Sequence, residues 1–452
     1  MTDINTLFEN IYDSVNTRST AILKSKSLGL ESRNESLLSS SLNTLPAGPP
    51  EEFLLQQKIR PLFGKHGVNT TPIGTHPDFI ELEANDYETK NHYVCTLFVD
   101  IKGSTRLSLL YPLEKIFQFK NAVIKTCVET IRSFDGHVHR LMGDAVMAFF
   151  GGSNIEKENA AADAINCSIT LRALLEQSIK PWMEKEGIDS KDFGFRVGCD
   201  FGDDHEVLWG SFGYQTVGEV SATGLPVDMA SKLQGLATKN QTMLGQGILE
   251  FINWPEEYSK IKEKDNKGEK IAKPIVTPNL TDSEGRSINY QMRLLNYKKS
   301  LGYSALPGQV RQQIEGSNVI DHSSISYSCF VVEDQNKEEY ISASKFLEKG
   351  LSLEFQLTAN TRTGLVFPLS VHFVKTNHGK DVPEEERGIE HTPVSRKLFT
   401  SHTSKYNTTP LPTASTTLNE STSYRGLHTM KCEVSDNNGR LLFRDWIGVM
   451  IK

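Results

Sequence analysis

The stretch FVDIKGST, residues 98–105, decides the fold of the largest part of this chain. The apolar, β-rich residues 93–99 lead into it and predict a buried strand, and a helix is expected to follow the Gly-Ser-Thr turn. Backbone N–H groups at the start of a helix favour a bound phosphate, and the residues placed there are Gly103, Ser104 and Thr105. Asp100 beside a phosphate requires a divalent cation between the two anions, for which Mg²⁺ is suited. The stretch therefore predicts a metal-assisted phosphate site.

A second acidic residue lies in a tight turn of the segment LMGDAVMAFF, residues 141–150. Asp144 follows Gly143 between two β-like runs. If the strands carrying Asp100 and Asp144 are neighbours, their carboxylates converge and can hold two metal ions about 3.5–4 Å apart. Either aspartate alone could simply end a strand, but the two together in these contexts predict metal binding.

The bulk composition is that of an ordinary globular protein. The chain has 452 residues, of which 38% are hydrophobic and 23% charged, and its net charge of −7 argues against a nucleic-acid partner. Six cysteines without CxxC spacing predict buried thiols in a reducing compartment. No signal peptide and no apolar run of about 18 residues is evident, so we expect a cytoplasmic protein without a membrane span.

The pattern of apolar residues divides the chain into four parts. Alternating strands and helices predict an α/β domain, and alternating short strands with polar turns predict an all-β, sandwich-like domain after it. The predicted parts are a helical or irregular extension at 1–90, the α/β domain at 91–300, a Gly- and Pro-punctuated linker at 301–316 and the β-rich domain at 317–452.

Several motifs in this order resemble the class III nucleotidyl cyclases, the adenylate and guanylate cyclase family. They are FVDIKGST, DGHVHRLMGDAVMAFFG at 135–151, the strand Phe195-Arg196-Val197-Gly198 and GLPVDMASKLQGLA at 224–237. The resemblance implies a catalytic fold that works as a head-to-tail homodimer, with the nucleoside triphosphate at the interface. It also implies two Mg²⁺ or Mn²⁺ ions per active site, held by Asp100, Asp144 and the backbone carbonyl of Ile101. The ribose 3′-hydroxyl would attack the α-phosphate, and pyrophosphate would leave.

The helix predicted over 227–237 departs from the family pattern at two positions. Asp228 stands where the family has an Asn that orients the ribose, and Lys232 where it has an Arg that stabilises the transition state. Lysine keeps the positive charge but loses the planar fork of arginine. Aspartate can accept a hydrogen bond from a ribose hydroxyl but would repel phosphate. The alternative is that both are ordinary solvent-facing helix residues.

The positions that read the base in the family hold Arg140 and Ser221, and neither purine-specific pair is present. Arg140 would shorten the pocket and offer several donors, and Tyr93 could narrow the pocket further, which favours a pyrimidine. The alternatives are a surface arginine paired with a carboxylate and a tyrosine packed in the core. An arginine fork suits O2 and N3 of cytosine, whereas O4 of uracil is a good single acceptor. CTP is therefore slightly favoured over UTP.

This combination resembles the pyrimidine cyclases of the bacterial Pycsar antiphage system. Residues 424–434 and 444–449 also resemble the adenylyl/guanylyl cyclase C-terminal sensor domain. The resemblance implies a second messenger for antiphage defence, a phage-derived trigger and a separate effector activated by the cyclic nucleotide. The alternatives are a passive β-sandwich at the C-terminus, an adenylate cyclase with unusual base readers, and a catalytically inactive sensor that only binds nucleotide.

Overall fold

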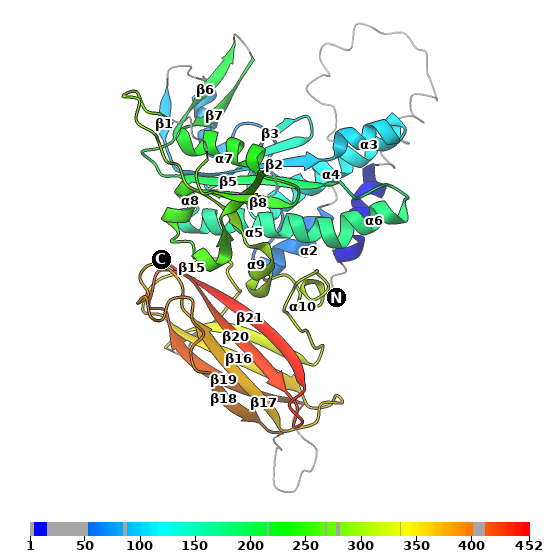
Figure 1. Ribbon diagram of the computed structural model, residues 1–452, viewed down its shortest axis with the longest axis vertical. Coiled ribbons are helices and arrows are strands. Elements are labelled where there is room, and N and C mark those ends of the chain that lie inside the picture. Colours follow the sequence, from blue (N-terminus) through cyan, green and yellow to red (C-terminus); the bar gives the residue numbers. More distant parts are fainter. Residues whose placement is uncertain are drawn as a thin grey trace.

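The computed structural model describes residues 4–15, 53–84, 88–214, 217–266, 269–276, 281–334, 336–400 and 412–452. Figure 1 shows an α/β domain stacked on a sandwich of strands, with two short helices between them. Much of the predicted N-terminal extension, residues 16–52, lies outside the described residues. Across the described ranges, no helix is both long enough and apolar enough to cross a bilayer.

A seven-stranded sheet forms the centre of the α/β domain, in the order β3-β4-β2-β5-β8-β12-β9. Strand β2, the third in this order, pairs antiparallel with β4 and with β5, and β5 pairs parallel with β8. The strands are β3 His137–Met142, β4 Ala145–Phe150, β2 Val94–Lys102, β5 Gly194–Gly202, β8 Gln241–Gly245, β12 Met292–Leu295 and β9 Ser259–Lys260.

Both faces of β2 are covered, which explains its nearly continuous apolar sequence. Cys95 and Leu97 belong to a cluster under helices α4 (Leu113–Ser133) and α5 (Lys157–Leu174). Phe98 belongs to a second cluster on the opposite face. Helix α7 and a three-stranded sheet cover that face, and their bounds are α7 Leu225–Leu236, β1 Thr89–Asn91, β6 Leu208–Tyr214 and β7 Val217–Thr223.

Residues before the central sheet take part in the same core. Leu7 and Phe8 of the helical residues 7–15 are buried in the cluster under α4 and α5, as are Leu55 and Ile59 of α2 (Leu54–Ile59). The remaining α-helices of this domain are α3 Ser104–Leu110, α6 Lys180–Lys185 and α8 Gln246–Phe251. Its 3-10 and π-helical segments are η1 Ile4–Thr6, η2 Arg60–Phe63, η3 Pro77–Ala84, η4 Leu175–Ile179 and η5 Glu256–Tyr258. A hairpin of β10 (Lys262–Asn266) and β11 (Glu269–Lys273) projects from it.

The C-terminal domain consists of two facing sheets whose inner side chains form one core. Alternation is clear in β16, where Leu353, Phe355 and Leu357 are buried and the residues between them are more exposed. One sheet has the order β14-β13-β16-β19 and the other β15-β21-β20-β17-β18. Their bounds are β13 Ile325–Glu333, β14 Asn336–Tyr340, β15 Phe346–Leu347, β16 Ser352–Asn360, β17 Leu369–Thr376, β18 Val394–Leu398, β19 Thr413–Ser421, β20 Gly426–Ser435 and β21 Leu441–Ile451.

The segment predicted as a linker, residues 301–316, is packed between the two domains and includes part of α9 (Tyr297–Tyr303) and all of α10 (Gly308–Arg311). Its apolar side chains are buried, including those of Leu301, Tyr303 and Leu306. The Arg311 guanidinium forms a two-pronged ion pair with the carboxylate of Asp445 on β21, at 2.7 Å for both nitrogen–oxygen pairs. The Gly and Pro residues of the predicted linker therefore separate short helices that pack between the domains.

Candidate active site

Asp100 and Asp144 lie at the same end of two neighbouring strands. Asp100 is near the end of β2 and pairs in register with Ala145, the first residue of β4, so Asp144 immediately precedes that strand. The backbone N–H of Ile101 donates to the carbonyl of Asp144 at 3.3 Å. Gly143 adopts φ +66°, a left-handed conformation that makes the tight turn before Asp144 favourable.

Both aspartates line one cleft of about 570 Å³. Its wall is formed by Asp100, Ile101, Lys102, Gly103, Ser104, Thr105, Arg106, Asp144, Asp192, Arg196 and Lys239. All the residues that the sequence predicted to hold metal and phosphate are therefore brought together. The volume is ample for a nucleotide's phosphate groups.

The turn before α3 requires glycine for two independent reasons. Gly103 has φ +90°, and a Cβ added there would lie 2.6 Å from the backbone oxygen of Asp192. Helix α3 begins at the next residue, whose hydroxyl donates to the carboxylate of Asp144. The Gly-Ser-Thr sequence thus places the start of a helix against the acidic turn.

Arg196 is the direct partner of Asp100 and was not singled out from the sequence. It lies opposite Asp100 on β5, and its Nε donates to Oδ2 of Asp100 at 2.8 Å. The Asp100 side chain is 13% exposed. A carboxylate this buried requires a positive partner. The available signal was a single charged residue inside the apolar strand Phe195–Val197.

The oxygen-rich lining of the cleft fits a hard divalent cation. Two carboxylates and the Ser104 hydroxyl are the kind of ligands that Mg²⁺ and Mn²⁺ prefer. Among the described residues, no group of three or more His, Cys, Asp or Glu side chains is arranged to hold a metal ion.

Arg140 and Ser221 lie away from this cleft but close to one another in the fold. Arg140 extends from β3 and forms an ion pair with Glu219 on β7. Glu219 and Ser221 are two residues apart on that strand and therefore project from the same face. Sequence reasoning missed Glu219, whose pairing joins strands from two different sheets.

Asp228 and Lys232 are both exposed on α7, one helical turn apart, and neither lines the cleft of Asp100. Within a single chain, the residues predicted for metal and phosphate are therefore separate from the residues predicted for base, ribose and transition state.

Tyr93 is packed in the core of the α/β domain. Its side chain faces the core under α4 and α5, because it alternates with Asp100 across the faces of β2. The residue is 4% exposed, and its hydroxyl donates to the backbone oxygen of Gly152 at 3.3 Å. Burial raises the pKa of Tyr93 to about 12. These contacts match the core-packing alternative for Tyr93.

Comparison with known proteins finds similarity over both domains. Residues 308–452 match the family model of the adenylyl/guanylyl and SMODS C-terminal sensor domain. A cytidylate cyclase of Escherichia coli is 40% identical over 420 residues, covering 92% of this chain and 91% of that protein. A cytidylate cyclase of Staphylococcus aureus is 32% identical and covers 87% of each chain. Among solved structures, the adenylyl cyclase CyaB from P. aeruginosa matches 46% of this chain and 95% of that chain, with 21% identity and a TM-score of 0.37.

Proposed function

The chain belongs to the family of cytidylate cyclases, class III nucleotidyl cyclases with a C-terminal sensor domain, and from this premise we propose that it converts CTP to 3′,5′-cyclic CMP and diphosphate. It is a pyrimidine nucleotide cyclase. The observation that carries the proposed mechanism is the convergence of Asp100 and Asp144 on one cleft beside the start of α3. UTP as the substrate, giving cyclic UMP, is the nearest alternative.

We propose that Asp100, Asp144 and the Ile101 carbonyl hold two Mg²⁺ or Mn²⁺ ions. Such ions, when bound, favour deprotonation of the 3′-hydroxyl and neutralise charge on the leaving pyrophosphate. The N–H groups at Gly103–Thr105 bind phosphate oxygens. Arg196 and Lys239, which line the same cleft, provide further positive charge for the triphosphate.

The pair of Arg140 and Glu219 supports CTP over UTP. Arg140 can donate to O2 and N3 of cytosine, while the Glu219 carboxylate can accept from the N4 amino group. Uracil presents an acceptor, O4, where cytosine has that amino group, and a carboxylate would repel it. Ser221 on the same face of β7 adds a hydroxyl that can donate or accept.

We propose that a complete site forms between two copies of the chain arranged head to tail. One copy contributes the cleft of Asp100 and Asp144, and the second copy contributes α7 with Asp228 and Lys232. The separation of these two sets within one chain and the exposure of α7 residues support this arrangement. Lys232 would stabilise the charge of the transition state, and Asp228 would accept a hydrogen bond from the ribose.

The physiological role that we propose is antiphage signalling in the cytoplasm. The match of residues 308–452 to a sensor-domain family supports a protein whose activity responds to a trigger, for which a phage-derived molecule is our proposal. The cyclic nucleotide would then activate a separate effector protein.

The decisive experiment identifies the product. Full-length protein is incubated with each of the four ribonucleoside triphosphates and Mg²⁺ or Mn²⁺, and the products are analysed by mass spectrometry, with Asp144→Ala as the control. We expect cyclic CMP from the unmodified protein and none from Asp144→Ala. A cyclic purine product alone would contradict a pyrimidine cyclase. Binding of triphosphate without release of pyrophosphate, even with phage extract added, would instead support an inactive sensor.

A further inference from the structure

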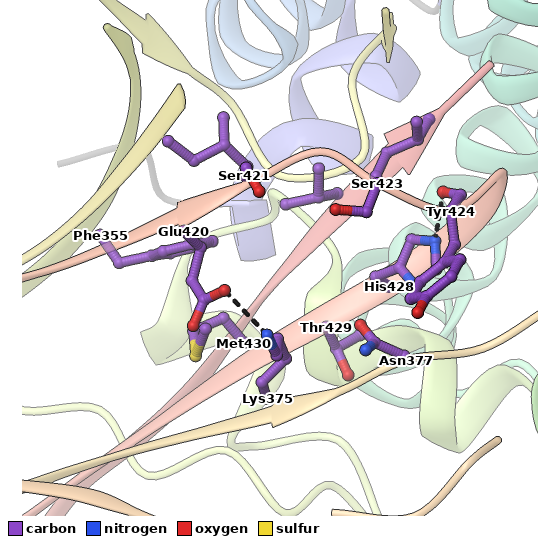
Figure 2. Close-up of a pocket in the computed structure, with 13 residues that line it drawn as sticks. Phe355, Lys375, Asn377, Glu420, Ser421, Ser423, Tyr424, His428, Thr429 and Met430 are labelled. Carbon is purple, nitrogen blue, oxygen red and sulfur yellow. Dashed lines mark hydrogen bonds and ion pairs between the residues drawn. The ribbon is translucent and has the colours of Figure 1, made fainter. Parts of the chain in front are cut away.

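A cavity of about 100 Å³ lies between the two sheets of the C-terminal domain (Figure 2). It is separate from the catalytic cleft and involves no residue of it. The lining combines an apolar floor with a polar rim: Leu353, Phe355, Met430, Val449 and Ile451 form the floor, and Lys375, Asn377, Glu420, Ser421, Ser423, Tyr424, His428 and Thr429 form the rim.

Three strands place a polar side chain on an inward-facing position at this end of the sandwich. On β17, the buried Val371 and Phe373 are followed in alternation by Lys375, and on β19 Leu418 is followed by Glu420. His428 occupies the corresponding place on β20, two residues before Met430. Burying a polar side chain costs free energy. Polar residues at core-facing positions on three strands, all at one end of the sandwich, therefore point to a function.

Lys375 and Glu420 form an ion pair that joins the two sheets. The Lys375 Nζ lies 2.8 Å from Glu420 Oε2, as Figure 2 shows, and the side chains are 34% and 25% exposed. The two opposite charges therefore stand side by side above an apolar floor, and a ligand can reach both. The charges of Lys375 and Glu420 cancel, and this favours a ligand that also has no net charge.

We propose that this cavity is a regulatory binding site for a small zwitterion with an apolar body, the chemistry of a free apolar amino acid. The carboxylate of such a ligand pairs with Lys375 and its ammonium with Glu420, so one ion pair is replaced by two charge-assisted ones. A ligand with only one charge would leave one partly buried protein charge without a partner. At about 30 Å³ for one water of the liquid, a cavity of this size corresponds to roughly three waters, which is close to the size of the four-carbon side chain of leucine.

The wall of the cavity is connected to the catalytic domain through two histidines. The backbone N–H of His378 donates to Nδ1 of His428 at 3.2 Å. The His378 ring packs against Tyr258 with ring centroids 5.2 Å apart, and its Nδ1 lies 3.4 Å from a carboxylate oxygen of Glu257. Tyr258 directly precedes β9, the edge strand of the catalytic sheet. A ligand that moves β20 would therefore act on the edge of the catalytic sheet. The effect of the ligand on turnover rests on the proposed cyclase function, whereas binding of the ligand does not.

The first test measures binding to the full chain. Isothermal titration calorimetry and thermal unfolding are carried out with L-leucine, and with 4-methylpentanoate and 3-methylbutylamine as counterparts that carry one charge each. We expect leucine to bind and raise the melting temperature, with at least ten-fold weaker binding of both counterparts. Absence of binding by leucine, methionine and phenylalanine alike, or equal binding of a counterpart, overturns the proposal.

The second test places the ligand. Lys375→Met and Glu420→Gln should each weaken leucine binding at least ten-fold. Lys337→Met and Glu354→Gln are matched controls, because Lys337 and Glu354 form a similar ion pair, at 2.7 Å, elsewhere in the same domain. Ser423→Trp at the exposed rim keeps the ion pair, and with it the fold, yet should block the cavity. Unchanged binding in Ser423→Trp, or loss of binding in the controls, overturns the site.

The third test separates this inference from the proposed function. Leucine should change the rate of cyclic CMP formation at least two-fold in the unmodified protein but not in Lys375→Met. Leucine binding in a protein that cyclises no triphosphate contradicts the cyclase proposal and leaves the binding site standing. Normal turnover with no leucine binding overturns the site alone, and binding that leaves turnover unchanged overturns its regulatory role.

Discussion

At the scale of single residues, the proposed contact of Glu219 with the base can be tested through the choice between CTP and UTP. We expect Glu219→Gln to reduce the ratio of kcat/KM for CTP to that for UTP by about 5-fold, because a good bidentate base contact contributes about 1–3 kcal/mol of discrimination and the single contact of Glu219 falls at the low end of that range. The measurement is steady-state formation of cyclic CMP and cyclic UMP. Glu81→Gln is the control, since Glu81 is an exposed glutamate 3.5 Å from Lys90. A ratio unchanged in Glu219→Gln would remove Glu219 from base recognition.

The buried carboxyl of Asp200 should make the free energy of unfolding depend on pH. Burial raises the pKa of this carboxyl to about 7, even though Tyr290 donates to it at 2.6 Å. In the unfolded chain the pKa is about 3.9. Between these values the folded state holds a proton that the unfolded state releases, so this group destabilises the fold increasingly as pH rises from about 4 to about 7.

Asp200→Asn should remove that dependence while keeping an acceptor for the backbone N–H groups of Phe201 and Ile248. We expect the free energy of unfolding of the variant, relative to the unmodified protein, to rise by up to about 1.4 kcal/mol per pH unit between pH 5 and pH 7. Urea unfolding at pH 5, 6, 7 and 8 measures it. A constant difference across this range would show that Asp200 is ionised in the fold throughout.

The sequence predicted six of the residues that line the Asp100 cleft, because each lies in a local motif whose chemistry is visible in a few residues. They are Asp100, Ile101, Gly103, Ser104, Thr105 and Asp144. Arg196 and Glu219 escaped because their importance arises from pairing between strands far apart in the chain. The core position of Tyr93 follows from the alternation of the strand, which decides the face of a side chain.

At the scale of elements, the strands could be predicted from the sequence, but the helices of residues 301–316, which lie between the two domains, could not. Alternation of apolar and polar residues, as in β16, directly reports which face is buried. The segment 301–316 has Gly and Pro at intervals that are typical of a linker, and helices as short as α10 leave no periodic signal. What fixes it is an ion pair between Arg311 and the distant strand β21.

Arg311→Met should destabilise the protein by about 3–5 kcal/mol, because it leaves the Asp445 carboxylate, 16% exposed, without its partner. Chemical denaturation followed by tryptophan fluorescence measures the change. Arg286→Met is the matched control, since Arg286 is 70% exposed and also pairs with an aspartate, and we expect at most about 0.5 kcal/mol there. Similar small effects at both positions would mean that the junction does not depend on this pair.

At the scale of the whole molecule, the proposed head-to-tail dimer makes a quantitative prediction. Asp144→Ala and Lys232→Ala should each abolish turnover alone, yet a 1:1 mixture of the two should recover about a quarter of the unmodified rate. Half of the dimers are then mixed, and each mixed dimer has one intact and one doubly altered site. Product formation after mixing and re-equilibration measures this. No recovery, with mixed dimers detected by native mass spectrometry, would place both residues in the same site of one chain.

The two domains also share a core. Ala343, Phe346, Leu427 and Met450 of the C-terminal domain belong to the same apolar cluster as the strands and helices beneath the catalytic sheet. A hydrogen bond also joins the two domains there, because the side chain of Asn166 on α5 donates to the backbone carbonyl of Ala343 at 2.8 Å. The division of labour between catalysis and sensing is thus built on continuous packing.

That continuity restricts how such a protein can change over generations. Recombination could replace the C-terminal domain with that of a distant relative. The new side chains would then not fit the buried residues that pack around Phe346. New trigger specificities should therefore arise mostly by point substitution within an inherited pair of domains, and lineages of the two halves should share one branching history.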